Sequence, residues 1–138
     1  MTHRVVDTFA VLAWLQDEAG AAQMERLMRE AATGEARLEM SSINVGEVYY
    51  RLIKAGRAAD AEQFLLRVMT RELPIVRVPA TDARVDRATK LKAQHPISYA
   101  DAFAVGLATE HGIPLVTNDP EIMHLAELGL VKIEQLRR

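Results

Sequence analysis

Short apolar runs rich in β-branched residues recur along the chain, separated by longer segments whose apolar residues repeat at helical spacing. Runs of this kind predict buried strands. They lie at residues 5–6, 38–40, 75–78, 115–117 and 131–133. Because strands and helical segments alternate, the pattern indicates a parallel sheet that is covered by helices.

The segments between the predicted strands read as helices, and several begin at residues that favour helix N-termini. Ser41-Ser42 offer an N-cap after the second strand, and Thr81 and Ser98 take the same position before two later helices. The predicted helices cover residues 9–15, 21–32, 43–55 and 61–69, a segment that follows Thr81, residues 99–111, and a last segment that follows Asn118-Asp119-Pro120 and ends at Gly129.

The expected order of elements is βααβααβαβαβ, give or take a short helix. This order fits the α/β class, as a three-layer sandwich around a central, mainly parallel five-stranded sheet. A chain of 138 residues, of which 49% are hydrophobic, can bury a core of its own. We therefore interpret residues 1–138 as a single domain.

The chain contains no cysteine, which excludes disulfides, thiolate metal sites and cysteine nucleophiles. Any metal must be held by oxygen or nitrogen ligands, and the composition suits a reducing compartment. Asp7 interrupts the first apolar region, which argues against a secretory signal peptide, and no stretch is long enough to span a bilayer. We therefore expect a cytoplasmic protein that does not contact a membrane.

The overall charge does not identify a nucleic-acid-binding protein. The 17 lysines and arginines are balanced by 19 acidic residues, which gives a net charge of −2. Arg51, Lys54 and Arg57 lie on or just past the helix 43–55, where solvation of the surface is their simplest role. Only a symmetric homodimer that pools two copies would form a convincing basic groove.

Four acidic residues stand in settings that are unusual for surface charges. Asp7 directly follows the first predicted strand and Asp119 closely follows the fourth, so both are expected at the carboxyl edge of the sheet, where ligands gather. Glu47 and Asp101 lie among apolar residues, in helices that begin near that edge. Because crowded carboxylates repel one another, such a cluster usually persists with a cation. The pattern predicts an all-oxygen site for Mg²⁺ or Mn²⁺.

Each of these acids also has a purely structural interpretation. Asp7 and Asp119 can serve as N-caps of the helices that follow them, and Glu47 can pair with Arg51 one helical turn later. Asp101 stands three residues after Ser98, which is close to a capping-box arrangement, so its role can also be purely structural. Capping alone does not require all four acids, however, and Asp101 shares a helical stripe with apolar side chains, where an unpaired carboxylate is costly.

The acids fall in four short motifs, which read VVDT at residues 5–8, SINVGEV at 42–48, ISYADA at 97–102 and TND at 117–119. With these motifs in this order and at these distances, the sequence resembles a PIN domain, and within that family a VapC-type toxin of a toxin–antitoxin pair. The resemblance covers nearly the whole chain. It implies a metal-dependent endoribonuclease that hydrolyses RNA phosphodiester bonds with Mg²⁺ or Mn²⁺.

The resemblance also assigns residues and partners. It implies a cognate antitoxin protein, and a homodimer is expected. Glu121 matches a frequent extra acid of the family. The residues expected to bind the metal and to act in catalysis are Asp7, Glu47, Asp101 and Asp119. Asp7 and Asp101 are the expected main ligands. The residues expected to orient ligands or phosphate are Thr117, Asn118 and Ser42.

Three other interpretations stay open. The chain could be a PIN-domain nuclease that is not a toxin. It could be a phosphoacceptor signalling domain, since an aspartate after a strand also binds Mg²⁺ there, although the paired acids and late lysine of such domains are missing. It could also be a catalytically silent binding module, whose acids are caps or members of salt bridges.

Overall fold

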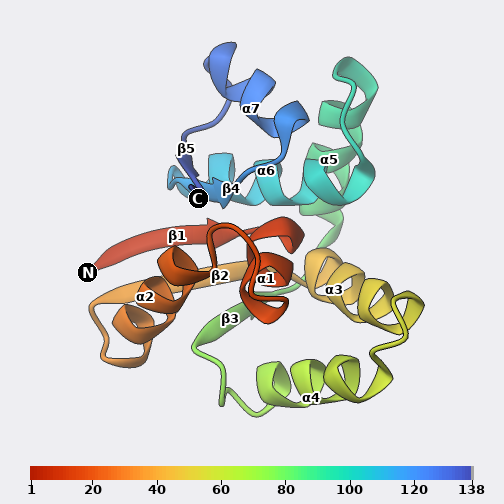
Figure 1. The fold of residues 1–138 in the computed structure, drawn as a ribbon. Coiled ribbons are helices and arrows are strands. Elements are labelled where there is room, and N and C mark those ends of the chain that lie inside the picture. The colour runs from red at the N-terminus through yellow and green to blue at the C-terminus, as the bar shows by residue number, and fades with distance from the viewer. Residues whose placement is uncertain (138) are drawn as a thin grey trace.

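The computed structural model describes residues 1–137, in which strands and helices alternate along the chain (Figure 1). Within this part of the chain, no helix is both long enough and apolar enough to cross a membrane. The strands are β1 (Thr2–Val6), β2 (Ala36–Ser41), β3 (Ile75–Val78), β4 (Leu115–Thr117) and β5 (Ile133–Gln135). The helices are α1 (Thr8–Leu15), α2 (Ala21–Ala32), α3 (Ser42–Lys54), α4 (Ala58–Met69), α5 (Asp82–Gln94), α6 (Tyr99–His111) and α7 (Pro120–Glu127).

The five strands form one parallel sheet in the order β3-β2-β1-β4-β5. The central strand β1 pairs with β2 on one side and with β4 on the other, and Val6 lies opposite Val116. Because the strands are parallel, the residues that follow β1 and β4 emerge at the same edge of the sheet. The topology therefore brings Asp7 and Asp119 together, although they are far apart in the sequence.

Helices cover both faces of the sheet, with α1 to α4 on one side and α5 to α7 on the other (Figure 1). Side chains of the strands alternate between these two layers. In β1 and β4, Val5 and Leu115 face α5–α7, whereas Val6 and Val116 face α1–α4. The predicted three-layer α/β sandwich is therefore confirmed.

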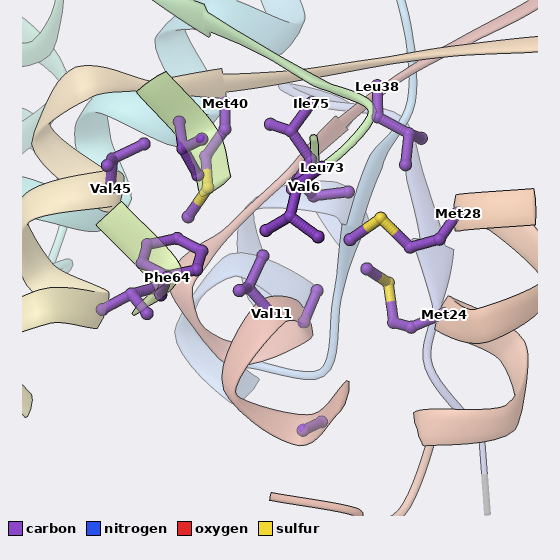
Figure 2. Close-up of a cluster of buried hydrophobic side chains, with 14 of the residues drawn as sticks. Val6, Val11, Met24, Met28, Leu38, Met40, Val45, Phe64, Leu73 and Ile75 are labelled. Atoms are coloured by element: carbon purple, nitrogen blue, oxygen red, sulfur yellow. The ribbon is translucent and has the colours of Figure 1, made fainter. Parts of the chain in front are cut away.

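The core on the α1–α4 side holds the end of β1 in place (Figure 2). Val6 is fully buried there and packs in one cluster with Val11 of α1, Met24 of α2 and Phe64 of α4. Burial of each such side chain contributes about 1.5–3 kcal/mol. Since Val6 directly precedes Asp7, this packing also fixes the point at which the first acid leaves the sheet.

The structure differs from the sequence prediction at the last strand and, by one helix, from the expected order of elements. Both α5 and α6 were predicted as segments, after Thr81 and at 99–111, but the expected order counted one helix between β3 and β4, give or take a short helix. The last strand was predicted at 131–133 and runs over 133–135. The predicted run relied on apolar residues, whereas β5 is an edge strand with the polar Glu134 and Gln135 in its ladder. The Gln23 side chain binds one backbone group of this edge strand by donating to the Gln135 carbonyl at 3.2 Å.

Candidate active site

Asp7 lies at the end of β1 and caps α1. It is 1% exposed, and its Oδ1 accepts a hydrogen bond from the Ala10 amide at 2.8 Å. Its second oxygen, Oδ2, accepts from the Thr117 hydroxyl. The predicted capping role is therefore present. Burial of the whole carboxyl group, however, goes beyond what a surface cap requires.

Asp119 caps α7 in the same way, with Pro120 as the first residue of the helix. Its Oδ1 accepts from the amides of Glu121 and Ile122, at 2.8 Å and 3.3 Å. The Asp119 amide in turn donates to Thr117 Oγ1 at 3.0 Å. The Thr117 hydroxyl thus bridges the two caps, because it donates to Asp7 and accepts from Asp119. Capping uses only Oδ1 of Asp119, and the same carboxyl group also forms a side-chain hydrogen bond with Asp101.

Asp101 opens the buried stretch of α6. Its backbone amide donates to Ser98 Oγ at 3.1 Å, which makes Ser98 the N-cap of this helix. The Asp101 side chain is directed at Asp119, and the residue is 7% exposed. The capping arrangement engages the amide of Asp101, while its carboxyl group faces the other acids and takes part in side-chain hydrogen bonds with Asp119 and Ser98.

Glu47 reaches the same region from the middle of α3. Its Oε2 accepts hydrogen bonds from Arg51 Nη2 at 3.2 Å and from Tyr50 Oη at 3.3 Å. The pairing with Arg51 considered from the sequence is therefore confirmed. Both partners hold one oxygen of the carboxylate. For Glu47 Oε1 no hydrogen bond is found within residues 1–137.

Three of the four acids line an open pocket of about 430 Å³ at the carboxyl edge of the sheet, and the fourth, Asp7, is buried beside them. Glu47, Asp101 and Asp119 line it, together with Glu121, and the buried Asp7 lies close enough to interact with Glu47 and Asp119. Four segments of the chain therefore supply carboxylates to one place. The structure brings together every acid that the sequence singled out.

Burial and mutual repulsion make two of these carboxyl groups hard to ionise. Burial is the main cause that raises the pKa of Asp7 to about 7, and the charges of Asp119 and Glu47 add to it. Burial likewise raises the pKa of Asp101 to about 7, with a further contribution from Asp119. A cation within the cluster would stabilise the ionised forms and remove this cost.

The donor set fits a hard divalent cation. Carboxylate oxygens of Asp101, Asp119 and Glu121 lie within 4.8 Å of one another, so one ion could contact all three. All ligands on offer are oxygens, which Mg²⁺ and Mn²⁺ prefer over softer donors. The residues present are therefore compatible with the metal that the sequence pattern predicts.

The three expected supporting residues differ in their surroundings. Thr117 is fully buried between Asp7 and Asp119. Ser42 accepts a hydrogen bond from Arg77 Nε at 3.0 Å, and Asn118 is exposed. Among residues 1–137 neither Ser42 nor Asn118 bonds to one of the four acids, so their role in orienting ligands or phosphate stays a prediction.

Asn44 is a positioning residue that the sequence analysis did not single out. It is fully buried, and its Nδ2 donates to the Ala100 carbonyl at 3.0 Å and to Thr8 Oγ1 at 3.4 Å. Thr8 follows Asp7 and Ala100 precedes Asp101, so Asn44 ties the two acid-bearing segments together. Its position three residues before Glu47, on the same side of the helix, was the available signal.

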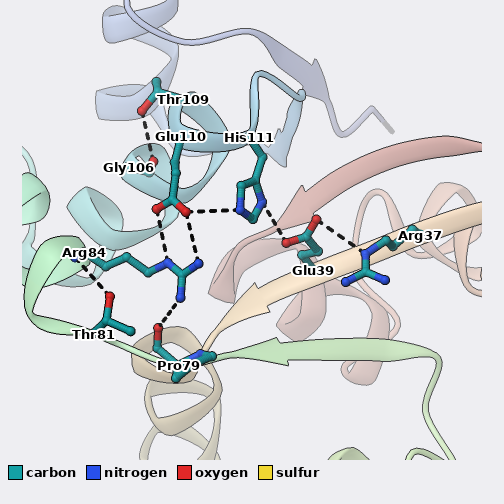
Figure 3. A network of polar contacts seen from close by, with 9 residues as sticks. All are labelled: Arg37, Glu39, Pro79, Thr81, Arg84, Gly106, Thr109, Glu110 and His111. Carbon is teal, nitrogen blue, oxygen red and sulfur yellow. Dashed lines mark hydrogen bonds and ion pairs between the residues drawn. The ribbon is translucent and has the colours of Figure 1, made fainter.

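A second polar cluster holds the far end of α6 (Figure 3). Glu39 of β2 is 4% exposed and lies 2.9 Å from His111 Nδ1 and 3.6 Å from Arg37 Nε. Glu110 pairs with Arg84 of α5 at 3.0 Å, and this hydrogen bond lowers the pKa of Glu110. The cluster links α6 to β2 and α5, so it anchors the helix that carries Asp101.

Comparisons with solved structures find the same architecture in several toxin–antitoxin proteins. The chain is 15% identical to VapBC2 from Rickettsia felis, solved with a promoter DNA fragment, with a TM-score of 0.71 over 97% of this chain and 98% of that one. For DNA-bound VapBC from Salmonella typhimurium, identity is 17% and the TM-score 0.68, over 99% of both chains.

A third similar structure is VapC20 from Mycobacterium tuberculosis, described as a toxin that cleaves the sarcin–ricin loop. Identity is 18% and the TM-score 0.64, over 80% of this chain and 84% of that one. At this level of identity, the three likenesses establish the fold. No curated protein sequence matches the chain significantly. The model of the PIN domain family matches residues 4–128, so the chain belongs to the PIN-domain family of nucleases.

Proposed function

We propose that this chain is a metal-dependent endoribonuclease that hydrolyses RNA phosphodiester bonds, and that residues 1–138 act as a single nuclease domain. The observation that carries the proposal is the convergence of Asp7, Glu47, Asp101 and Asp119 at one pocket of a PIN-type sheet. The caps of α1 and α7 each use only Oδ1 of their aspartate, and Oδ2 of Asp7 accepts from the Thr117 hydroxyl. Because each carboxylate oxygen has two lone pairs, capping and cation binding are compatible. This compatibility weighs against the silent binding module.

The acids have distinct roles in this proposal. Asp7 and Asp101 are the main ligands of a divalent cation, and Glu47 and Asp119 complete its surroundings directly or through water. Bound there, Mg²⁺ or Mn²⁺ would activate the attacking water and stabilise charge on the leaving oxygen. Through its hydroxyl, Thr117 holds the carboxyl group of Asp7 and the backbone amide of Asp119 in place.

The proposed biological setting is that of a toxin with a cognate antitoxin protein in the cytoplasm. Support comes from the similar structures, two of which are described as VapBC assemblies on DNA. A homodimer is proposed because the chain has a net charge of −2, so that pooled basic residues of two copies would help to hold RNA. The RNA substrate follows from the family resemblance.

The proposal is tested by incubating total cellular RNA with the purified protein and Mg²⁺ or Mn²⁺. Discrete fragments are expected with the wild type, and EDTA should abolish them. Asp7→Asn and Asp101→Asn should each lower the rate by more than the roughly 10- to 100-fold typical of residues that only support metal ligands.

The matched control is Asp86→Asn, which removes an exposed carboxylate of α5 outside the pocket. It should cleave RNA like the wild type, and circular dichroism should show that all variants are folded. If neither Mg²⁺ nor Mn²⁺ supports cleavage, or if Asp7→Asn and Asp101→Asn cleave RNA as fast as the wild type, the proposed function is wrong.

A further inference from the structure

Two side chains at the acidic pocket have no part in the acid cluster itself. Among the described residues that line the pocket, Arg51 of α3 is the only basic one and Phe9 of α1 the only aromatic one. Helices α1 and α3 pack against each other, so the two side chains border the pocket from neighbouring elements.

Arg51 is weakly held in its present position. Its Nε and Nη2 both contact the same oxygen, Glu47 Oε2, at 3.3 Å and 3.2 Å, and the side chain is 50% exposed. Such a pair does not use the two-pronged geometry that suits guanidinium, and exposed pairs of this kind add little stability. A phosphate group could therefore replace the carboxylate, with two parallel hydrogen bonds.

Glu47 would keep its position if Arg51 turned towards a phosphate. The Tyr50 hydroxyl also donates to Glu47 Oε2, at 3.3 Å. A pocket lined by three of the four acids and by Glu121 repels a polyanion, and Arg51 is the only described cation on its lining that can offset this repulsion. The electrostatics therefore favour contact between Arg51 and the RNA backbone.

Phe9 keeps an aromatic ring open to solvent at the same pocket. It is 45% exposed, although the residues on either side of it, Thr8 and Ala10, are buried. An exposed apolar residue is ordinary in isolation, but this ring lies beside the carboxylates that are proposed to act on RNA. Nucleic-acid bases stack on exposed aromatic rings with little dependence on sequence.

We propose that Arg51 and Phe9 are the substrate-binding side chains of this pocket, with Arg51 on a phosphate and Phe9 stacked on a base of single-stranded RNA. The inference rests on the proposed ribonuclease function and names the substrate contacts of that site. It predicts that the two residues act differently. Arg51 contributes through charge, so its effect depends on salt, whereas the stacking of Phe9 does not.

The test is equilibrium binding of a fluorescein-labelled single-stranded RNA at several salt concentrations, in an Asp101→Asn background that prevents cleavage. Phe9→Ala should weaken binding by roughly five- to a hundredfold with an unchanged salt dependence, and Phe9→Trp should restore it. Arg51→Ala should weaken binding and reduce the slope of log K against log salt by about 0.7, as expected for one lost phosphate contact.

Matched controls lie elsewhere on the surface. Arg26→Ala removes an arginine that also faces a glutamate one turn away, and Leu66→Ala removes an apolar side chain that is 59% exposed. Neither should change RNA affinity. If Phe9→Ala and Arg51→Ala bind like these controls while the wild type cleaves RNA, the inference is wrong and the proposed function stands.

Two further outcomes would overturn the inference. If Phe9→Ala converts a dimer into a monomer in sedimentation experiments, Phe9 is an interface residue and the stacking role is rejected. If the wild type neither binds nor cleaves RNA, the proposed function fails as well. Cleavage by the wild type therefore separates failure of the inference from failure of the function.

Discussion

Asp7 has two roles that oppose each other energetically. As an N-cap, its Oδ1 stabilises α1 through the Ala10 amide. As a buried carboxyl group among other acids, it is costly to ionise. The capping roles of Asp7 and Asp119 could be predicted from the sequence, because a cap depends on local order along the chain. Their burial could not, since it depends on the packing of distant segments around them.

This conflict predicts how Asp7→Asn changes stability with pH. The folded-state pKa of Asp7, about 7, lies above its ordinary value of 3.8, so its favourable contribution exists below about pH 4 and is lost as the pH rises through 7. Asparagine cannot ionise and still caps well. In the absence of metal, the unfolding temperature of Asp7→Asn minus that of the wild type should therefore be larger at pH 8 than at pH 4.

Thermal melts followed by circular dichroism in EDTA test this prediction. Asp86→Asn serves as the control, because Asp86 is exposed on α5. The difference in unfolding temperature between Asp7→Asn and the wild type could instead stay constant or shrink towards pH 8. That result would show that the carboxyl group of Asp7 is not costly to ionise in the folded protein.

At the scale of elements, α6 links the pocket to the rest of the fold. It begins near Asp101 and ends at Glu110 and His111, which bind groups on α5 and β2 (Figure 3). The apolar pattern predicted this helix and its bounds correctly. The anchoring partner Glu39 was not predicted, because a single acid inside an apolar strand reads as a break in the pattern until its partners are known.

The hydrogen bond from Asn44 of α3 to the Ala100 carbonyl at the start of α6 predicts the effect of Asn44→Ala. This change removes the partly buried 3.0 Å hydrogen bond to the Ala100 carbonyl and the buried contact with Thr8. Unfolding in urea should show that the free energy of unfolding falls by about 1–3 kcal/mol. Cleavage of RNA should slow as well, since both neighbouring acids lose a positioning contact.

Gln63→Ala is the control for this substitution, because Gln63 is an exposed residue of α4. Its effect on the free energy of unfolding should fall within about 0.5 kcal/mol of zero. If Asn44→Ala costs no more stability than Gln63→Ala, the proposed tie between the two segments is wrong.

At the scale of the whole molecule, the order of strands creates the site. The chain continues from β1 to β2 on one side and later returns to β4 on the other, and ligands bind at such a switch point in parallel sheets. The sequence predicted a parallel sheet and two acids at its edge. It could not supply the strand order, which depends on how the helices pack on the two faces of the sheet.

Binding of Mn²⁺ to the metal-free protein tests most directly whether these acids form a cation site. Calorimetric titrations of the wild type and Asp101→Asn at pH 6 and pH 8 would measure it. Because Asp7 and Asp101 have pKa values of about 7, the ion must displace protons at pH 6. The wild type should bind Mn²⁺ more tightly at pH 8 than at pH 6, and Asp101→Asn should bind it more weakly than the wild type at both pH values. Equal affinity for the two proteins, or no dependence on pH, would contradict it.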